Sequence, residues 1–219
     1  MQTAIQNLDT AYQNFFKRVK QGENPGFPKF KNKRDNRKSY KSNMARNNIE
    51  IFEKSIKLPK LGLVKCRVSK RVEGRIISAT VSQNPSGKYF VSVACTDIDI
   101  ESFDKTGTAV GIDVGIKNFA IIAFGESQNY NSDKFDNPKY LAKSEKKLIR
   151  EQHRLSRKPK GSQNRKKARI KVAKIHEKVS NQRNDFLHKI TIYLVKNYDI
   201  ISVENLKIKN MVKNRKLAK

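Results

Sequence analysis

Residues 109–124, AVGIDVGIKNFAIIAF, decide the fold of the second half of the chain. Residues 109–115 are apolar or small except for Asp113, and this pattern predicts a strand interrupted by one acid. Residues 118–124 predict a second strand, and residues 125–130 lead into a third. We therefore expect an antiparallel three-stranded start to a domain, from Val110 to Tyr130.

A second acid follows the last apolar strand of the chain. Residues 199–203 predict that strand, and Glu204 ends it. In an open α/β sheet such strands lie side by side, so we expect Glu204 and Asp113 to point to one place. A carboxylate in a buried strand is costly unless it is paired or bound to a metal. Hard oxygen ligands gathered in this way suit Mg²⁺ or Mn²⁺, and two such ions can activate water against a phosphodiester. From spacing alone an alternative stays open, in which Asp113 bonds a turn and Glu204 is a surface acid.

A helical hairpin is predicted between the two acidic strands, at about residues 138–197. Apolar residues recur every seven positions in its first helix and every three or four in its second. Residues 158–162, KPKGS, make the turn. Basic residues outnumber acidic ones several-fold on its outer faces, so the hairpin is expected to face a nucleic acid.

The first half of the chain has a different character. Residues 3–20 predict an amphipathic helix, and residues 24–46 predict a loop in which aromatic side chains alternate with basic ones. The rings can stack on bases or, alternatively, anchor the loop to a core. Short strands with turn residues between them follow in residues 48–96 and suggest a small β barrel. Residues 97–106 predict a linker.

The charge of the chain narrows its class of partner. The 219 residues carry a formal net charge of +28, with a sequence pI of about 10.2. Such an excess repels itself, so a polyanionic partner, DNA or RNA, is expected. The residues predicted to contact it are basic and lie in the loop and the hairpin: Lys29, Lys31, Lys33, Arg34, Arg37, Lys38, Arg157, Lys158, Lys160, Arg165, Lys166, Lys167, Arg169 and Arg183.

Other classes of protein fit the sequence poorly. No stretch has the apolar length of a membrane helix, and the first residues do not resemble a signal peptide, so a cytoplasmic, nucleoid-associated protein without a membrane partner is expected. Cys66 and Cys95 are far apart and form no CxxC pair. They indicate neither a disulfide framework nor a zinc site.

The motifs around both acids resemble those of a known family. Residues 111–120, GIDVGIKNFA, are similar to the first RuvC motif of the TnpB/OrfB family of transposon-encoded RNA-guided DNA endonucleases, which are related to type V CRISPR effectors. Residues 202–206, SVENL, resemble the second RuvC motif. Further resemblance lies, in order, in residues 14–16, 26–31, 137–141, 155–162, 164–169, 181–189 and 210–215.

This resemblance implies a function and a fold. Asp113 and Glu204 match the first two acids of the family's three-acid, divalent-metal site, and guide RNA and DNA are the implied partners in transposition and DNA recombination. The implied fold is α+β or α/β, a small wedge-like β barrel followed by an incomplete RNase H-like (RuvC) domain with an inserted helical hairpin. The implied domains are a recognition-lobe helix (1–22), a basic loop and barrel (23–106), and a partial nuclease domain (107–219).

The sequence also departs from the family. The third acid, the four-cysteine zinc module and the first strands are absent from it, so we expect an internal fragment. We expect this chain to bind RNA or DNA but to cut poorly alone, because two carboxylates hold a metal loosely; the missing C-terminal part could be a separate chain. The alternatives are a non-catalytic nucleic-acid-binding module, such as an RNA-binding accessory protein or a repressor, and a decayed transposon remnant.

Overall fold

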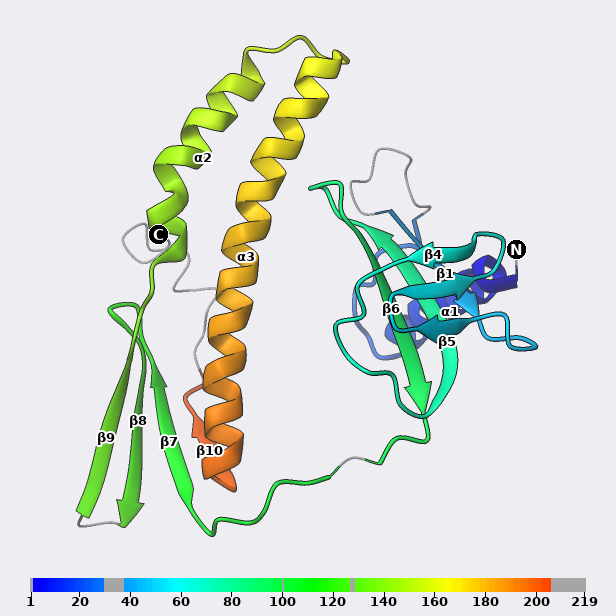
Figure 1. The fold of residues 1–219 in the computed structure, drawn as a ribbon. Coiled ribbons are helices and arrows are strands. Elements are labelled where there is room, and N and C mark those ends of the chain that lie inside the picture. The colour runs from blue at the N-terminus through cyan, green and yellow to red at the C-terminus, as the bar shows by residue number, and fades with distance from the viewer. Residues whose placement is uncertain (1, 30–37, 100, 127–128, 206–219) are drawn as a thin grey trace. The chain divides into compact units, whose positions relative to one another are not determined.

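The computed structural model describes residues 2–29, 38–99, 101–126 and 129–205 (Figure 1). The chain divides into two compact units, Met1–Ile100 and Glu101–Lys219, which are called the N-terminal and C-terminal units below. Both helices and several small sheets are present, so the mixed α+β class predicted from the sequence is confirmed.

The N-terminal unit begins with the predicted amphipathic helix, α1 (Gln2–Lys20). Its last turn is basic, which suits the negative end of the helix dipole, and Gly22 follows with a positive φ of 72°. Much of its apolar stripe is exposed, including Ile5 and Phe16. The Phe27 ring packs edge-on against α1, 5.4 Å from the ring centroid of Phe15. Phe27 therefore contacts α1 and not a buried core, and it remains 61% exposed.

The strands of this unit form two three-stranded sheets. One sheet has the order β1-β5-β6, and the other has the order β2-β3-β4. Their bounds are β1 (Lys38–Asn43), β2 (Glu50–Phe52), β3 (Ser55–Leu58), β4 (Gly62–Lys65), β5 (Arg75–Gln83) and β6 (Tyr89–Thr96). The β5–β6 hairpin turns at residues 84–87 as predicted, with Gly87 at a φ of 86°.

The predicted closed barrel is wrong for the described residues. The two sheets share no ladder; instead they bury side chains against each other in one core of Ile49, Ile56, Leu58 and Ala79. Alternating strands supply an apolar face, and a face can be covered by a second sheet as well as by closure. A second correction concerns β1, which lies inside the predicted loop of residues 24–46. It is a strand because it pairs with β5 along its whole length.

The C-terminal unit is built on a four-stranded sheet with the order β10-β7-β8-β9. Its strands are β7 (Ala109–Val114), β8 (Asn118–Glu126), β9 (Asn129–Asp136) and β10 (Ile200–Val203). Strands β7, β8 and β9 are antiparallel neighbours, and β10 lies beside β7, both as predicted; the β7–β10 pairing is parallel. The third strand lies later than residues 125–130, because β8 continues to Glu126. Its polar sequence NYNSDKFD gave no apolar signal.

The predicted helical hairpin is confirmed as α2 (Tyr140–Ser156) and α3 (Gln163–Asn197), which lie side by side in Figure 1. Ser162 caps α3, since its Oγ accepts from the Arg165 backbone N–H at 3.1 Å. Within the hairpin Glu151 is buried and accepts from Arg154 Nη1 at 2.8 Å. Among the described helices, none has the length and apolar character to cross a membrane.

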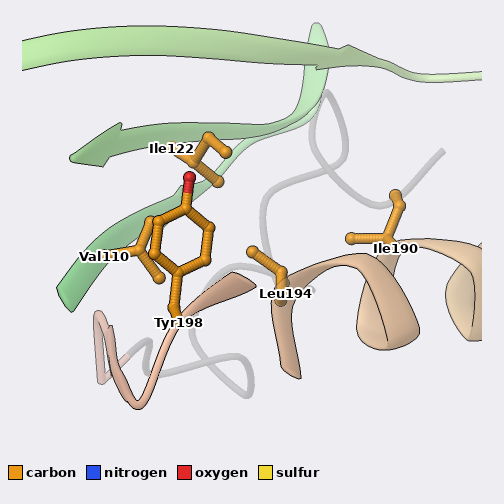
Figure 2. Packing of buried hydrophobic residues seen from close by; sticks show 5 residues of the cluster. All are labelled: Val110, Ile122, Ile190, Leu194 and Tyr198. Atoms are coloured by element: carbon orange, nitrogen blue, oxygen red, sulfur yellow. The ribbon is translucent and has the colours of Figure 1, made fainter. Parts of the chain in front are cut away.

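The end of α3 covers one face of the four-stranded sheet. Figure 2 shows the Tyr198 ring beside Val110 and Ile122, with Leu194 and Ile190 reaching the same core from α3. Ile122 is fully buried. The opposite face of the sheet has exposed residues on β7, and the strand alternation places Asp113 there.

Candidate metal centre and nucleic-acid interface

Asp113 and Glu204 are brought together by the parallel pairing of β7 and β10. The register pairs Ile112 with Val203. The ladder ends at this pair: Asp113 is the next residue of β7, and Glu204 is the first residue after β10. Continuing the register by one residue would set Glu204 opposite Asp113, on strands about 4.8 Å apart. Two acids separated by most of the C-terminal unit in sequence therefore lie at the carboxyl ends of two adjacent strands.

Both carboxylates are exposed, which corrects the prediction of an acid inside a buried strand. The strand alternates, because Val110, Ile112 and Val114 turn toward the core while Asp113 belongs to the other face. On β8 it opposes Ile121, while Gly111, two positions earlier, opposes Ala123. Because the Asp113 side chain is exposed, a solute can reach it.

The donor set suits a hard divalent cation. Within the described part of the chain neither Asp113 nor Glu204 makes an ion pair or a hydrogen bond, so their oxygens are available as ligands. Two adjacent negative charges repel each other, and a bound cation relieves that repulsion. Among the described residues no three His, Cys, Asp or Glu side chains gather as a metal-binding group, so these residues supply two carboxylates and no more.

A third acid, Asp199, lies at the opposite end of β10 and was not predicted from the sequence as a site residue. Its Oδ1 accepts from the Thr106 backbone N–H at 3.1 Å, and its Oδ2 accepts from the Gly107 backbone N–H at 2.8 Å. These two bonds, that of Thr106 first, hold the pKa of the Asp199 carboxyl below its usual range. The sequence contains a signal for this contact. Asp199 lies between α3 and β10, and a Thr-Gly-Thr segment, residues 106–108, precedes β7.

The predicted nucleic-acid residues of the hairpin fall into two groups. Most are exposed on α3 or in the turn before it: Arg157, Lys160, Lys166, Lys167, Arg169 and Arg183. Arg165 and Lys158 are half-buried. Arg165 Nη1 donates to the carbonyl oxygens of Leu155 at 3.1 Å and of Lys158 at 2.7 Å. Arg165 therefore has a structural role at the end of α2, in addition to any contact with a nucleic acid.

In the N-terminal unit the predicted residues are less fully described. Lys29 and Lys38 are exposed. Lys31, Lys33, Arg34 and Arg37 lie outside the described residues.

Comparison with known families decides the relationship. Residues 90–215 match the OrfB_IS605 family, which is described as "Probable transposase". The chain belongs to this family. The match includes Asp113, Glu204 and the whole helical hairpin, and the resemblance to the TnpB/OrfB family stated from the motifs is confirmed.

Curated relatives of this OrfB-family chain are longer than it is. It is 36% identical to a "Putative RNA-guided DNA endonuclease" of Streptomyces pristinaespiralis, covering 100% of this chain and 52% of the relative. It is 33% identical to the "Putative RNA-guided DNA endonuclease InsQ" of Escherichia coli, covering 98% of this chain and 50% of the relative. A Mycobacterium tuberculosis protein of similar name is 26% identical over 90% of this chain. The chain thus spans about half the length of the curated relatives it matches.

Proposed function

We propose that this chain contributes two metal-binding carboxylates and a basic nucleic-acid surface to an RNA-guided DNA endonuclease of the transposon-encoded type. The parallel register of β7 and β10 supports the proposal, because it pairs Ile112 with Val203, the residues immediately before the exposed Asp113 and Glu204. The names of the relatives supply the class of reaction.

Asp113 and Glu204 would hold Mg²⁺ or Mn²⁺ through carboxylate oxygens. Such an ion supplies charge compensation for hydrolysis of a phosphodiester. The residues themselves provide negative charge at the ends of two hydrogen-bonded strands, and the exposure of both side chains gives a phosphate backbone access to them. The surrounding arrangement of a parallel β7–β10 pair in an otherwise antiparallel sheet is compatible with an RNase H-like domain.

The hairpin would hold guide RNA, its duplex with DNA, or both. Lys166 and Lys167 are exposed in the first turns of α3, next to the exposed Arg157 and Lys160 of the preceding turn. Cations in this density neutralise phosphates and release counterions, which gives a steep salt dependence and no sequence preference from the protein itself. Base pairing to the guide would then supply sequence recognition. A protein of this charge would associate with DNA in the nucleoid.

Titration with Mn²⁺, followed by electron paramagnetic resonance of the free ion, tests the metal site in the full chain. Asp113→Asn and Glu204→Gln should each weaken Mn²⁺ binding about ten-fold or more, since each removes one of two charged ligands. Asp185→Asn is the matched control: Asp185 is an exposed acid of the same unit, paired with Lys189 at 2.7 Å. Equal Mn²⁺ affinity in all four proteins would refute the metal site.

Binding of RNA and of an RNA–DNA duplex across a range of salt concentrations tests the second half of the proposal. The slope of log affinity against log salt should fall by about one for each phosphate-contacting lysine removed, as in Lys166→Ala or Lys167→Ala. Unchanged slopes would mean that these lysines face solvent only. Binding that is unaffected by EDTA and by Asp113→Asn would favour a non-catalytic binding module.

A further inference from the structure

The start of β10 is tied to the segment that leads into β7. The Asp199 carboxylate accepts from the backbone N–H groups of two successive residues, Thr106 and Gly107. Successive N–H groups of this kind form a small anion-binding nest, and Gly107 completes the turn with a φ of 69°. The Thr108 carbonyl oxygen accepts from the Asp199 backbone N–H at 2.9 Å. The contact joins segments that are 92 and 93 positions apart in sequence.

The remainder of β10 has little to fix its register. The strand has four residues, lies at the edge of the sheet, and leaves all four side chains exposed, with Ile200 at 65% and Val203 at 56%. Ladder hydrogen bonds alone do not distinguish one register from another, because every residue offers the same backbone groups. A shift by one residue turns every side chain to the other face. Glu204 would then leave the face of Asp113.

We propose that Asp199 is a positioning residue of the Asp113–Glu204 centre, because its carboxylate fixes β10 in the register that sets the two metal-binding acids side by side. The claim that Asp199 fixes the register of β10 depends only on the observed contacts. The claim that this register aligns two metal ligands rests on the proposed function. Two other contacts compete as anchors for β10: Tyr198 is buried in the core beside β7, and Thr108 Oγ1 donates to the Asn197 carbonyl oxygen at 2.7 Å. If these contacts suffice, removing the Asp199 carboxylate leaves the register unchanged.

Disulfide trapping reads the register directly. In a Cys66→Ser, Cys95→Ser background, the pair Gly111→Cys with Ser202→Cys reports the native register, in which residues 111 and 202 oppose each other. The pair Gly111→Cys with Val203→Cys reports a shift of one residue. A side chain at position 111 has room, since its Cβ would meet only the Ala123 carbonyl oxygen, at 3.9 Å. Opposed residues of neighbouring strands fall within the roughly 4.4–6.8 Å between Cα atoms that a disulfide needs.

With Asp199 intact, the 111–202 pair should oxidise and the 111–203 pair should not. With Asp199→Ala, the 111–203 pair should oxidise at a rate within about three-fold of the 111–202 pair. Exclusive 111–202 oxidation in the variant would overturn the proposal and assign the register to the contacts that remain, those of Tyr198 and Thr108. If Asp199→Ala does not unfold cooperatively, Asp199→Asn replaces it in the experiment, because asparagine keeps one acceptor oxygen. Oxidation of both cysteine pairs in that variant would support the proposal, and oxidation of the 111–202 pair alone would overturn it.

Mn²⁺ affinity is the second measurement. A disulfide between residues 111 and 202, which fixes the native register, tests whether that affinity can be restored. Asp199→Ala should weaken Mn²⁺ binding about ten-fold, in the range seen when supporting residues of metal ligands are removed. Oxidation of the 111–202 pair in that variant should restore the affinity. A loss that the disulfide does not restore would mean that Asp199 acts on overall folding and not through register. If Asp199→Ala shifts the register of β10 while Asp113→Asn leaves Mn²⁺ affinity unchanged, the role of Asp199 in fixing the register is supported and the proposed metal site is refuted.

Discussion

Replacing Arg165 with Ala tests whether this basic residue at the hairpin tip stabilises the fold or contacts a nucleic acid. The Arg165 guanidinium bridges the carbonyl oxygens of Leu155 and Lys158 at 3.1 and 2.7 Å. Leu155 is in the last turn of α2, and Lys158 is in the turn that follows it; the Leu155 carbonyl oxygen also accepts from the Lys158 backbone N–H at 3.2 Å. The Arg165 side chain therefore closes the turn between the helices, and its loss removes a charged donor from two carbonyl oxygens in a half-buried place.

The expected loss of stability follows from these two bonds. A hydrogen bond from a charged group contributes about 1.5–3 kcal/mol. Water can reach both carbonyls once the half-buried side chain is gone, so we expect about 2 kcal/mol for the pair together. For a unit of this size that corresponds to a melting temperature lower by roughly 6–10 °C.

Thermal melting followed by far-ultraviolet circular dichroism measures this loss, and Lys166→Ala is the matched control. Lys166 is adjacent, exposed, and not part of the turn contacts. Lys166→Ala should leave the melting temperature within about 2 °C of wild type, as for other surface substitutions, and lower the salt slope of RNA binding. The reverse pattern, with unchanged melting of Arg165→Ala and a lower salt slope, would refute the structural role of Arg165.

Three further predictions concern stability. Gly74→Ala should destabilise the N-terminal unit by at least about 2 kcal/mol in urea unfolding, because Gly74 has a φ of 74° and an added Cβ would overlap the Thr96 carbonyl oxygen; a wild-type midpoint would contradict this. Ile122→Ala should cost about 3–4 kcal/mol, and its control Ile122→Val about 1 kcal/mol, since Ile122 is fully buried; equal midpoints would show that the core collapses around the cavity. The Asp199 pKa is lowered in the folded chain, so its stabilisation is present above the unfolded-state pKa of about 3.9 and is lost as pH falls through the lower folded pKa. The melting temperatures of wild type and Asp199→Asn should therefore differ at neutral pH, begin to converge as pH falls below about 4, and meet only below the folded-state pKa; a constant gap would mean that charge plays no part.

Strands with a clear alternation were predictable from local sequence, and strands held by their neighbours were not. Residues 75–83 carry an alternating pattern, and β5 has those same bounds. In contrast β1, with the sequence KSYKSN, has one large apolar residue, and its extended form depends on pairing with β5. The same limit explains the two sheets found in place of a barrel: alternation identifies a buried face but does not identify what covers it.

The candidate site shows a similar division. The two motifs identified Asp113 and Glu204, and the order of apolar strands predicted that β7 and β10 would be neighbours. The alternation of β7 could also have placed Asp113 on the open face, because the apolar residues at 110, 112 and 114 occupy the other. For Asp199 the sequence offers a signal, the Thr-Gly-Thr segment before β7, but not the contact itself, and for Arg165 it offers none; both roles depend on backbone groups that only the folded chain brings near.

The length of α3 sets a minimum size for a nucleic acid that contacts both the basic tip of the helical hairpin and the Asp113–Glu204 pair. From Lys166, near the start of α3, to Asn197 at its end, the helix rises about 47 Å. Strand β10 then runs back parallel to β7, opposite to α3 in Figure 1, and its four residues recover about 13 Å. Lys166 and the proposed Asp113–Glu204 centre are therefore about 34 Å apart along the helix. At about 3.4 Å per base pair, a duplex must be roughly 10 base pairs long to lie against both. A shorter duplex can bind the basic tip or approach the carboxylates, and only a longer one can couple the charge of the hairpin to the metal centre.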